Sequence, residues 1–375
     1  LVKLIPLLHA EKDLKLAQRK ARLEAFTRIV ERVGDHAFFT PMFKAALDGD
    51  DALRRVLLPL LKKCNDADEH ERVVREMKTG NGTVRRFCAT FLKRAGGRTA
   101  LRVLSESLGH SGWGDRREAM DTTMELGGHH AIPAIGQVVL NGSADERLHA
   151  LALLGDPKYV KAAPSAARDA IAPALDERNL VVLTAAIRAY GAVAPADIFF
   201  DVAGPYLRSQ DRRVQRAALQ CMEAFPGRRT VEELSRVWRA ADVDVRQTVL
   251  GVLRSIGDED VLPLMVEALS DAALAIRNAA LEAVIELGRS HRVDTTRMLL
   301  WLLRTPDVRV RRLAVDIARE VGDPLRQLWP RLLELLRDED WWVREQVVEA
   351  LVELAGDELT RHIVAYLEDE NDVVR

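Results

Sequence analysis

The side chains best suited to chemistry are the nine histidines, which could hold a metal ion or move a proton. They are scattered along the chain, and the only histidine–glutamate pair is His70-Glu71. A di-iron site needs several such ligands converging from different helices. No phosphate-binding loop, nucleophile elbow, zinc-protease motif or C-x-x-C pair occurs. We therefore expect no catalytic residue, no metal site and no cofactor, and we interpret the histidines as surface residues.

Tryptophan offers a second kind of chemistry, because an indole can stack on a base or anchor a protein partner. Trp113 lies beside Asp115 and Arg116, although tryptophan at a helix start more often packs against its neighbours. In the pair Trp341-Trp342, one indole should face the core and the other an exposed surface or the next repeat. Trp113 and Trp342 are therefore candidates for partner binding.

Charge is distributed unevenly, although the whole chain carries only −2. Residues 1–100 have a formal charge of +8 and residues 331–375 one of −8. A basic surface could attract an acidic or phosphorylated segment of a protein, and a solvated face without a partner is the alternative. The basic candidates are Arg55, Lys62, Lys63, Arg86, Lys93 and Arg94, and the acidic counterparts are Glu282, Glu286, Glu345, Glu349 and Glu353.

A repeated helix would position these residues. From Asp307 the chain reads Asp-Val-Arg-Val-Arg, then apolar residues three and four apart, then Val-Gly-Asp-Pro, and similar lines start near Asp242, Ile276 and Trp342. This spacing places the apolar residues on one stripe of an α-helix. Aspartate before the helix can accept hydrogen bonds from its first turn, and glycine after it permits a left-handed end. Each copy thus predicts a capped amphipathic helix.

The residue that ends this helix, which we call a mark, recurs every 28–36 residues. A second helical segment lies between successive marks. Such spacing predicts repeated helical hairpins, in which each repeat packs on its neighbours. The fold class is therefore all-α, an α-α superhelix of about eleven hairpins. The marks are Gly34, Asn65, Gly96, Gly127, Gly155, Gly191, Gly227, Gly257, Gly288, Gly322 and Gly356.

We expect residues 1–375 to form a single solenoid with three parts. A regular arm covers 1–140, an irregular joint covers 140–205, and a second regular arm covers 205–375. The joint is inferred from its stretched units and from several prolines, which stop or bend helices. The chain starts at Leu1, and its last residues look like the start of another repeat, so we interpret it as a fragment of a longer protein.

The D-x-x-V-R starts and G-D ends resemble the HEAT-repeat family, and the short unit is similar to the repeats of phycobilisome-lyase-type proteins. The resemblance extends over the chain and is strongest after about residue 205. It implies that an arginine near each helix start pairs with the capping aspartate of the adjacent unit, as a ladder that supports stacking. A basic track for nucleic-acid phosphates is the alternative. These arginines are Arg54, Arg85, Arg116, Arg246, Arg277, Arg311 and Arg344.

Two enzyme families resemble parts of this pattern. Deoxyhypusine hydroxylase binds two irons through several His-Glu pairs, whereas this chain has one. HEAT-like alkylpurine DNA glycosylase uses tryptophans with an aspartate and basic residues, as around Trp113, but that protein is strongly basic. A net charge of −2 with an acidic end disfavours wrapping of DNA.

We therefore expect a protein–protein interaction scaffold or regulatory module that is not an enzyme and that binds through the inner curve of the solenoid. Nucleic-acid binding, with or without glycosylase chemistry, is the alternative, as is help in ligand or cofactor attachment as in bilin lyases. The short repeats and the preference for arginine favour a cytoplasmic, bacterial protein. The cysteines fall on apolar helix positions and lie far apart, which disfavours disulfides.

Overall fold

The structure is a computed structural model, and it describes residues 36–63, 66–95, 97–110, 112–289, 294–321 and 325–353, together with residues 24, 25, 27–29, 32 and 364. The described residues form helices joined by short turns and contain no strand. The predicted all-α superhelix is confirmed. The chain divides into two compact units, Leu1–Phe199 (unit 1) and Phe200–Arg375 (unit 2).

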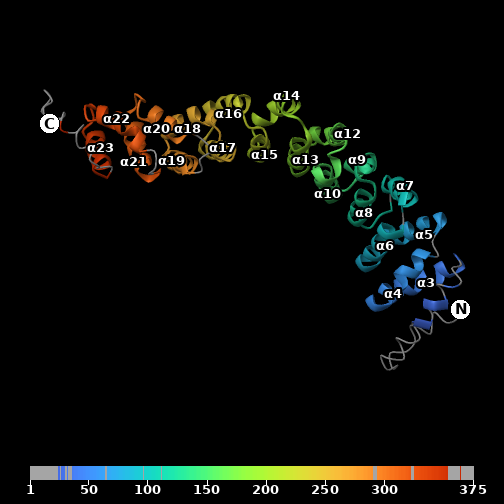
Figure 1. The fold of residues 1–375 in the computed structure, drawn as a ribbon. Coiled ribbons are helices and arrows are strands. Elements are labelled where there is room, and N and C mark those ends of the chain that lie inside the picture. Colours follow the sequence, from blue (N-terminus) through green and yellow to red (C-terminus); the bar gives the residue numbers. More distant parts are fainter. Residues whose placement is uncertain are drawn as a thin grey trace. The chain divides into compact units, whose positions relative to one another are not determined.

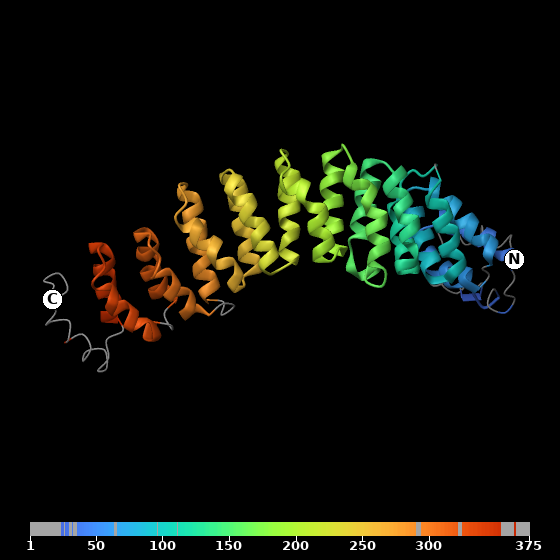
Figure 2. The same cartoon turned by 90° about the horizontal axis from the view of Figure 1, so that it is seen from above.

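In unit 1, consecutive helices pair into hairpins, and the members of these pairs form two layers (Figures 1 and 2). The first helices of the hairpins pack on one another, and the second helices do the same. The first helices are α3 (Phe39–Asp48), α5 (Ala67–Thr79), α7 (Gly97–Leu108), α9 (Ile132–Asn141) and α12 (Pro164–Ile171). The second helices are α4 (Asp51–Lys63), α6 (Gly82–Ala95), α8 (Arg117–Gly127), α10 (Ala144–Leu154) and α13 (Leu180–Val193).

Unit 2 repeats this arrangement of two layers. The helix α14 (Ala196–Leu207) contains the division between the units. The first helices are α16 (Arg228–Ala240), α18 (Leu262–Leu269), α20 (Thr295–Leu302) and α22 (Leu325–Leu335). The second helices are α15 (Arg212–Cys221), α17 (Val243–Ile256), α19 (Leu274–Arg289), α21 (Val308–Val321) and α23 (Trp341–Glu353).

The helix α17 shows why the repeated line folds as it does. The Asp242 carboxylate accepts a hydrogen bond from the Val245 backbone N–H at 3.0 Å, which caps the helix start. Val249 and Leu253 follow on the stripe that is buried in the core. Gly257 ends the helix with φ 62°, the left-handed conformation that glycine adopts without strain. The predicted cap, stripe and terminator are all present in this repeat.

The glycine marks are less uniform than predicted. Gly191 was expected to end a helix, but it lies buried inside α13. That helix continues to Val193 because Pro195 follows Ala194, and a residue before proline is driven into extended backbone. Gly155 ends its helix with right-handed rather than left-handed backbone. Five other marks lie outside the described residues: Gly34, Asn65, Gly96, Gly322 and Gly356.

The stretch predicted as an irregular joint contains a broken first helix. The short α11 (Pro157–Val160), then α12, then a 3-10 helix over Ala172–Asp176 take the place of one continuous helix. Each segment has proline in its first turn, where a missing N–H is tolerated. The irregularity is therefore local and has a proline at each break.

Candidate partner-binding surfaces

The arginines near the helix starts form a ladder between neighbouring repeats. In most repeats the ladder residue donates its backbone N–H to the carbonyl of the residue four positions earlier, at the helix start. Five of these guanidiniums in the described residues reach an acid of the next repeat, among them Arg311 to Asp338 at 2.8 Å and Arg246 to Asp271 at 2.6 Å. The remaining pairs are Arg85–Asp115 at 3.8 Å, Arg116–Glu146 at 3.6 Å and Arg147–Glu177.

The same guanidiniums also bind carbonyls of the turn that precedes them. Arg246 donates to the Trp238 carbonyl at 3.3 Å, and Arg311 donates to Thr305 and Pro306. Arg54, Arg277 and Arg344 are held in this way by carbonyls of their own turn. These side chains are used in stacking, which confirms a ladder between repeats for Arg85, Arg246 and Arg311, each paired with an aspartate that precedes the next second helix. Arg116 departs from the implied pairing because its acid is Glu146, within α10. They do not form a free basic track.

The six basic candidates of unit 1 lie on α4 and α6, two neighbouring second helices. Arg55 and Arg86 are exposed and, within the described residues, have no ion-pair partner. Lys62 and Lys63 are exposed in the last turn of α4, and Lys93 and Arg94 lie in the last turn of α6. Cations in a last turn are favoured by the helix dipole, so this placement also stabilises the helices.

A groove of about 360 Å³ runs between these two helices. Arg55 and Arg86 line it from opposite sides, and Leu58 and Phe87 lie between them. Thr83 and Thr90 add hydroxyl groups on the α6 side. The other two lining residues are Asp51 and Arg54, which pair with each other at 2.9 Å. The groove thus offers two uncompensated guanidiniums around a half-apolar surface.

Lys93 differs from Arg55 and Arg86 because it has an ion-pair partner. Its ammonium lies 3.0 Å from Glu125 of α8, the next second helix. Its charge is therefore partly neutralised by the adjacent repeat, and Arg55 and Arg86 dominate this part of the face.

Trp113 is held in the turn between α7 and α8. Its indole N–H donates to the Ser107 carbonyl at 3.0 Å, and the Lys78 ammonium lies 5.5 Å from the ring centroid. Asp115 is bound by Arg117, and that hydrogen bond holds the pKa of its carboxyl below the usual range. The indole N–H and the acid are thus both engaged in the turn, although binding of a partner at Trp113 stays a prediction.

The pair Trp341-Trp342 does not divide as predicted. Trp341 is 61% exposed and Trp342 is 39% exposed, and their rings meet edge to face at 5.4 Å. The core position is taken by Val343, from which the buried stripe of α23 continues through Val347 and Leu351. Because successive residues are about 100° apart around a helix, both indoles stand off that stripe.

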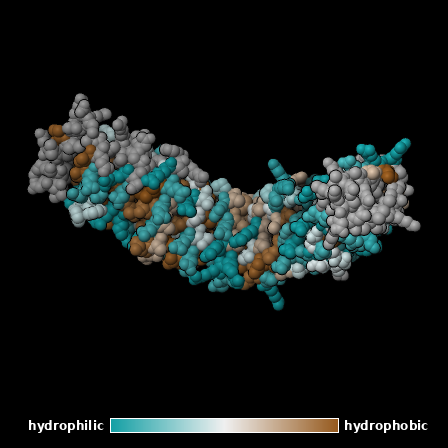
Figure 3. All heavy atoms as spheres, turned by 90° about the horizontal axis from the view of Figure 1, so that it is seen from below, coloured by the Kyte–Doolittle hydropathy of each residue, from teal (hydrophilic) through white to brown (hydrophobic). Residues whose placement is uncertain are grey.

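Two of the five acidic candidates of unit 2 are paired with arginines of neighbouring second helices. Glu286 of α19 lies 3.6 Å from Arg254 of α17, and Glu349 of α23 lies 3.0 Å from Arg319 of α21. Glu282 and Glu345 are exposed, while the side chain of Glu353 lies outside the described residues. On the coloured part of the face seen from below, hydrophilic residues predominate, and hydrophobic residues occur in short separate strips (Figure 3).

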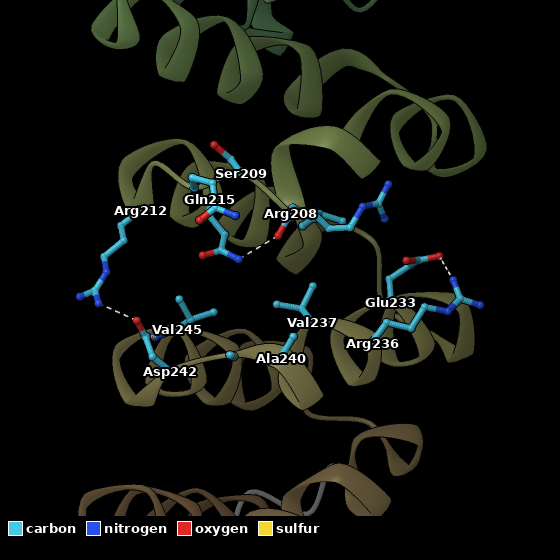
Figure 4. A pocket seen from close by; sticks show the side chains of 13 residues that line it. Arg208, Ser209, Arg212, Gln215, Glu233, Arg236, Val237, Ala240, Asp242 and Val245 are labelled. Atoms are coloured by element: carbon cyan, nitrogen blue, oxygen red, sulfur yellow. Dashed lines mark hydrogen bonds and ion pairs between the residues drawn. The ribbon is translucent and has the colours of Figure 1, made fainter.

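A pocket of about 560 Å³ in unit 2 was not predicted from the sequence. It lies between the end of α14 with the start of α15 and the end of α16 with the start of α17. Arg212 and Asp242 stand at one end and Glu233 and Arg236 at the other, with Val237, Ala240 and Val245 between them (Figure 4). The signal that could have found it is Gln215, which occupies the ladder position of α15.

Two further predictions concern titratable groups. His70 was expected at the surface but is only 3% exposed, beside Phe91, because it falls on the apolar stripe of α5. Burial lowers the pKa of its imidazole, and the nearby Asp66 opposes this. Cys88 is fully buried, as predicted, and burial raises the pKa of its thiol to about 12. Among the described residues, no three His, Cys, Asp or Glu side chains gather as a metal site.

Stacked helical hairpins in two layers define the class of α-helical solenoids. Residues 200–285 and 293–375 match the family model described as HEAT repeats. These two stretches are therefore HEAT repeats. Assignment of the chain to the phycobilisome-lyase type stays a prediction. No curated protein matches the sequence. In the described part of the chain, no helix has the length and apolar character needed to cross a membrane.

Solved structures with a similar fold share little sequence with the chain. An engineered protein matches with 15% identity and a TM-score of 0.37, over 100% of this chain and 95% of that chain. Kap95p, described with RanGDP, matches with 12% identity and a TM-score of 0.48, over 97% of this chain. Kap121p bound to Ste12p matches with 11% identity and a TM-score of 0.47, over 88% of this chain. The chain spans 58% of the Kap95p chain and 41% of the Kap121p chain.

Proposed function

We propose that this protein is a non-catalytic interaction scaffold, and that the second-helix face of unit 1 binds an acidic or phosphorylated segment of a partner protein. The observation that carries the proposal is the α4–α6 groove, where Arg55 and Arg86 are exposed without an ion-pair partner. Guanidiniums are well suited to carboxylates and phosphates because each can donate two parallel hydrogen bonds.

The ladder supports this choice of surface. Because most ladder arginines bind carbonyls and acids of the repeats themselves, they cannot supply the phosphate contacts of a nucleic-acid track. A partner would instead use residues that stacking leaves exposed. Leu58 and Phe87 also line the groove but are buried, so the charged and hydroxyl groups present most of its surface to a peptide.

The test is the affinity of a fluorescent peptide of glutamate and phosphoserine, measured by anisotropy at low salt. The double variant Arg55→Glu/Arg86→Glu should bind about tenfold or more weakly, because two attractive charges become repulsive. Arg98→Glu/Arg102→Glu makes the same charge change on α7, in the other layer of unit 1, and should retain most of the affinity.

Equal loss in both variants would show only a dependence on net charge and would contradict a specific groove. A labelled DNA duplex tests the alternative. If the duplex binds more tightly than the peptide and the affinity falls steeply with salt, nucleic acid is the better ligand.

A further inference from the structure

Each pair of a ladder arginine with the acid of the next repeat is called a rung. In unit 2, one rung has both of its residues replaced. Gln215 donates its backbone N–H to Asp211, as Arg246 does to Asp242 in the next repeat. Its side-chain amide donates to the Leu207 carbonyl at 2.9 Å, the counterpart of the Trp238 carbonyl that Arg246 binds. Glutamine thus makes the first contact of a rung but carries no guanidinium.

The acid of this rung is absent as well. In the neighbouring rungs it is Asp271 or Asp338, which stands in the turn before the next second helix. The residue in the same register before α17 is Ala240. With a shorter side chain on one side and a methyl group on the other, the space of a rung is left as the pocket of about 560 Å³.

The other residues that line the pocket suit the arginine side chain that the rung lacks. Val237, Ala240 and Val245 line the middle of the pocket, where an aliphatic stem could pack, and the Asp242 carboxylate stands at one end (Figure 4). Asp242 pairs with Arg212 at 2.6 Å, and Arg212 is also bound by Asp244. Arg212 would therefore keep one carboxylate if a second guanidinium displaced it from Asp242.

We propose that this pocket binds an arginine side chain supplied by a partner peptide, which would complete the rung from outside. The equivalent position holds a guanidinium between a turn carbonyl and a carboxylate at Arg246 and at Arg311. Lysine would fit less well, because its ammonium lacks the planar fork of donors that bridges two acceptors. An anion is the competing ligand: Arg212 and Arg236 are paired with Asp242 and Glu233, and Arg208 is the lining arginine without a printed ion pair among the described residues. This site lies in unit 2 and goes beyond the function proposed for unit 1.

The experiment measures binding of N-acetyl-arginine amide to the full chain by ligand-observed NMR, with the neutral citrulline analogue as the matched probe. Wild-type protein should bind the arginine probe about tenfold more tightly, since charge-assisted hydrogen bonds are roughly twice as strong as neutral ones. Gln215→Arg/Ala240→Asp should restore the internal rung, abolish this preference and raise the melting temperature by about 2–4 °C. Gln247→Arg adds one positive charge on the exposed surface of α17 and should leave binding unchanged.

The proposal is overturned if the two probes bind wild-type protein equally, or if the double variant retains the arginine preference. Tighter binding of an acetate or phosphate probe would also overturn it. Should the double variant not fold, Asp242→Asn replaces it, because asparagine caps a helix as well as aspartate does but lacks the charge. That variant should lose the preference for arginine over citrulline, and an unchanged preference would exclude Asp242 as the binding group.

Discussion

The second-helix faces of the two units carry charge in different ways. On α4 and α6 of unit 1, Arg55 and Arg86 flank a groove and have no acidic partner among the described residues. On α17 to α23 of unit 2, arginine and glutamate alternate between neighbouring helices, so that Arg254 pairs with Glu286 and Arg319 with Glu349. The segmental charges of the sequence suggested one basic and one acidic face. Pairing across repeats neutralises two of the acidic candidates, Glu286 and Glu349, whereas Glu282 and Glu345 are exposed.

The rungs inside unit 2 offer a second contrast, between a filled position and an open one. Arg311 and Asp338 are both less than one-tenth exposed, and the guanidinium binds two carbonyls besides the acid. At Gln215 the same position is open to solvent as a pocket. When the arginine–aspartate pair between two repeats is missing, the helices can therefore keep their positions and a pocket is left where the pair would lie.

The largest expected effect comes from breaking the filled rung. Arg311→Ala leaves the Asp338 carboxylate buried without its cation, which destabilises by about 3–5 kcal/mol. The loss should appear as a lower urea midpoint and as faster hydrogen exchange in α21 and α23. Arg297→Ala is the control, because its pair with Glu259 is exposed and contributes at most about 1 kcal/mol. If both variants lose the same stability, the ladder does not support stacking.

Acidic pH should lower the stability of unit 1 at a higher pH than that of unit 2. His70 of unit 1 is buried and its pKa is lowered, so the unfolded chain binds a proton that the folded chain resists. Stability from this group is present above about pH 6.5 and is lost as the pH falls below it, by about 1.4 kcal/mol for each pKa unit of difference. In unit 2, burial would raise the pKa of Asp307, but hydrogen bonds from Ser270 and Arg309 lower it to about 2. The stability from Asp307 is lost only as the pH falls below its usual range.

Hydrogen exchange at pH 5.5 and 7.5, corrected for the intrinsic rate, measures this difference. Protection of α5 and α6 should fall more than protection of α19 and α21. His70→Leu keeps the apolar contact with Phe91 and should remove the difference between the units. An acid response that persists in this variant would show that another group is responsible.

The sequence predicted the fold well, because capping and apolar spacing act within one helix. Asp242, Val249 and Gly257 have the roles that their types indicate. The predictions were wrong where a neighbouring residue determines where a helix ends or which side chain is buried. Gly191 lies inside a helix because Pro195 sets the end, and Trp341 and Trp342 are both exposed because Val343 takes the core position.

The candidate site was predictable only in part, for the same reason. The basic residues lie on the neighbouring helices α4 and α6, but the pairing of Lys93 with Glu125 depends on how α8 packs. The pocket at Gln215 becomes visible only when its position is compared with Arg246 and Arg311, and when Ala240 is recognised as the missing acid. Both observations require the alignment of residues between repeats, which cannot be derived from one helix alone.

The smallest expected effect tests whether pairing neutralises the face of unit 2. Arg254→Ser/Arg319→Ser removes two cations and leaves Glu286 and Glu349 uncompensated. A fluorescent lysine peptide should then bind about fivefold more tightly at low salt, since exposed pairs contribute at most about 1 kcal/mol each and are screened. Arg228→Ser/Arg297→Ser makes the same charge change on the first helices α16 and α20 and should raise the affinity less. Equal gains would mean that net charge attracts the peptide and that pairing on this face is irrelevant. A gain confined to the first variant would show that register between second helices decides which charges a partner meets.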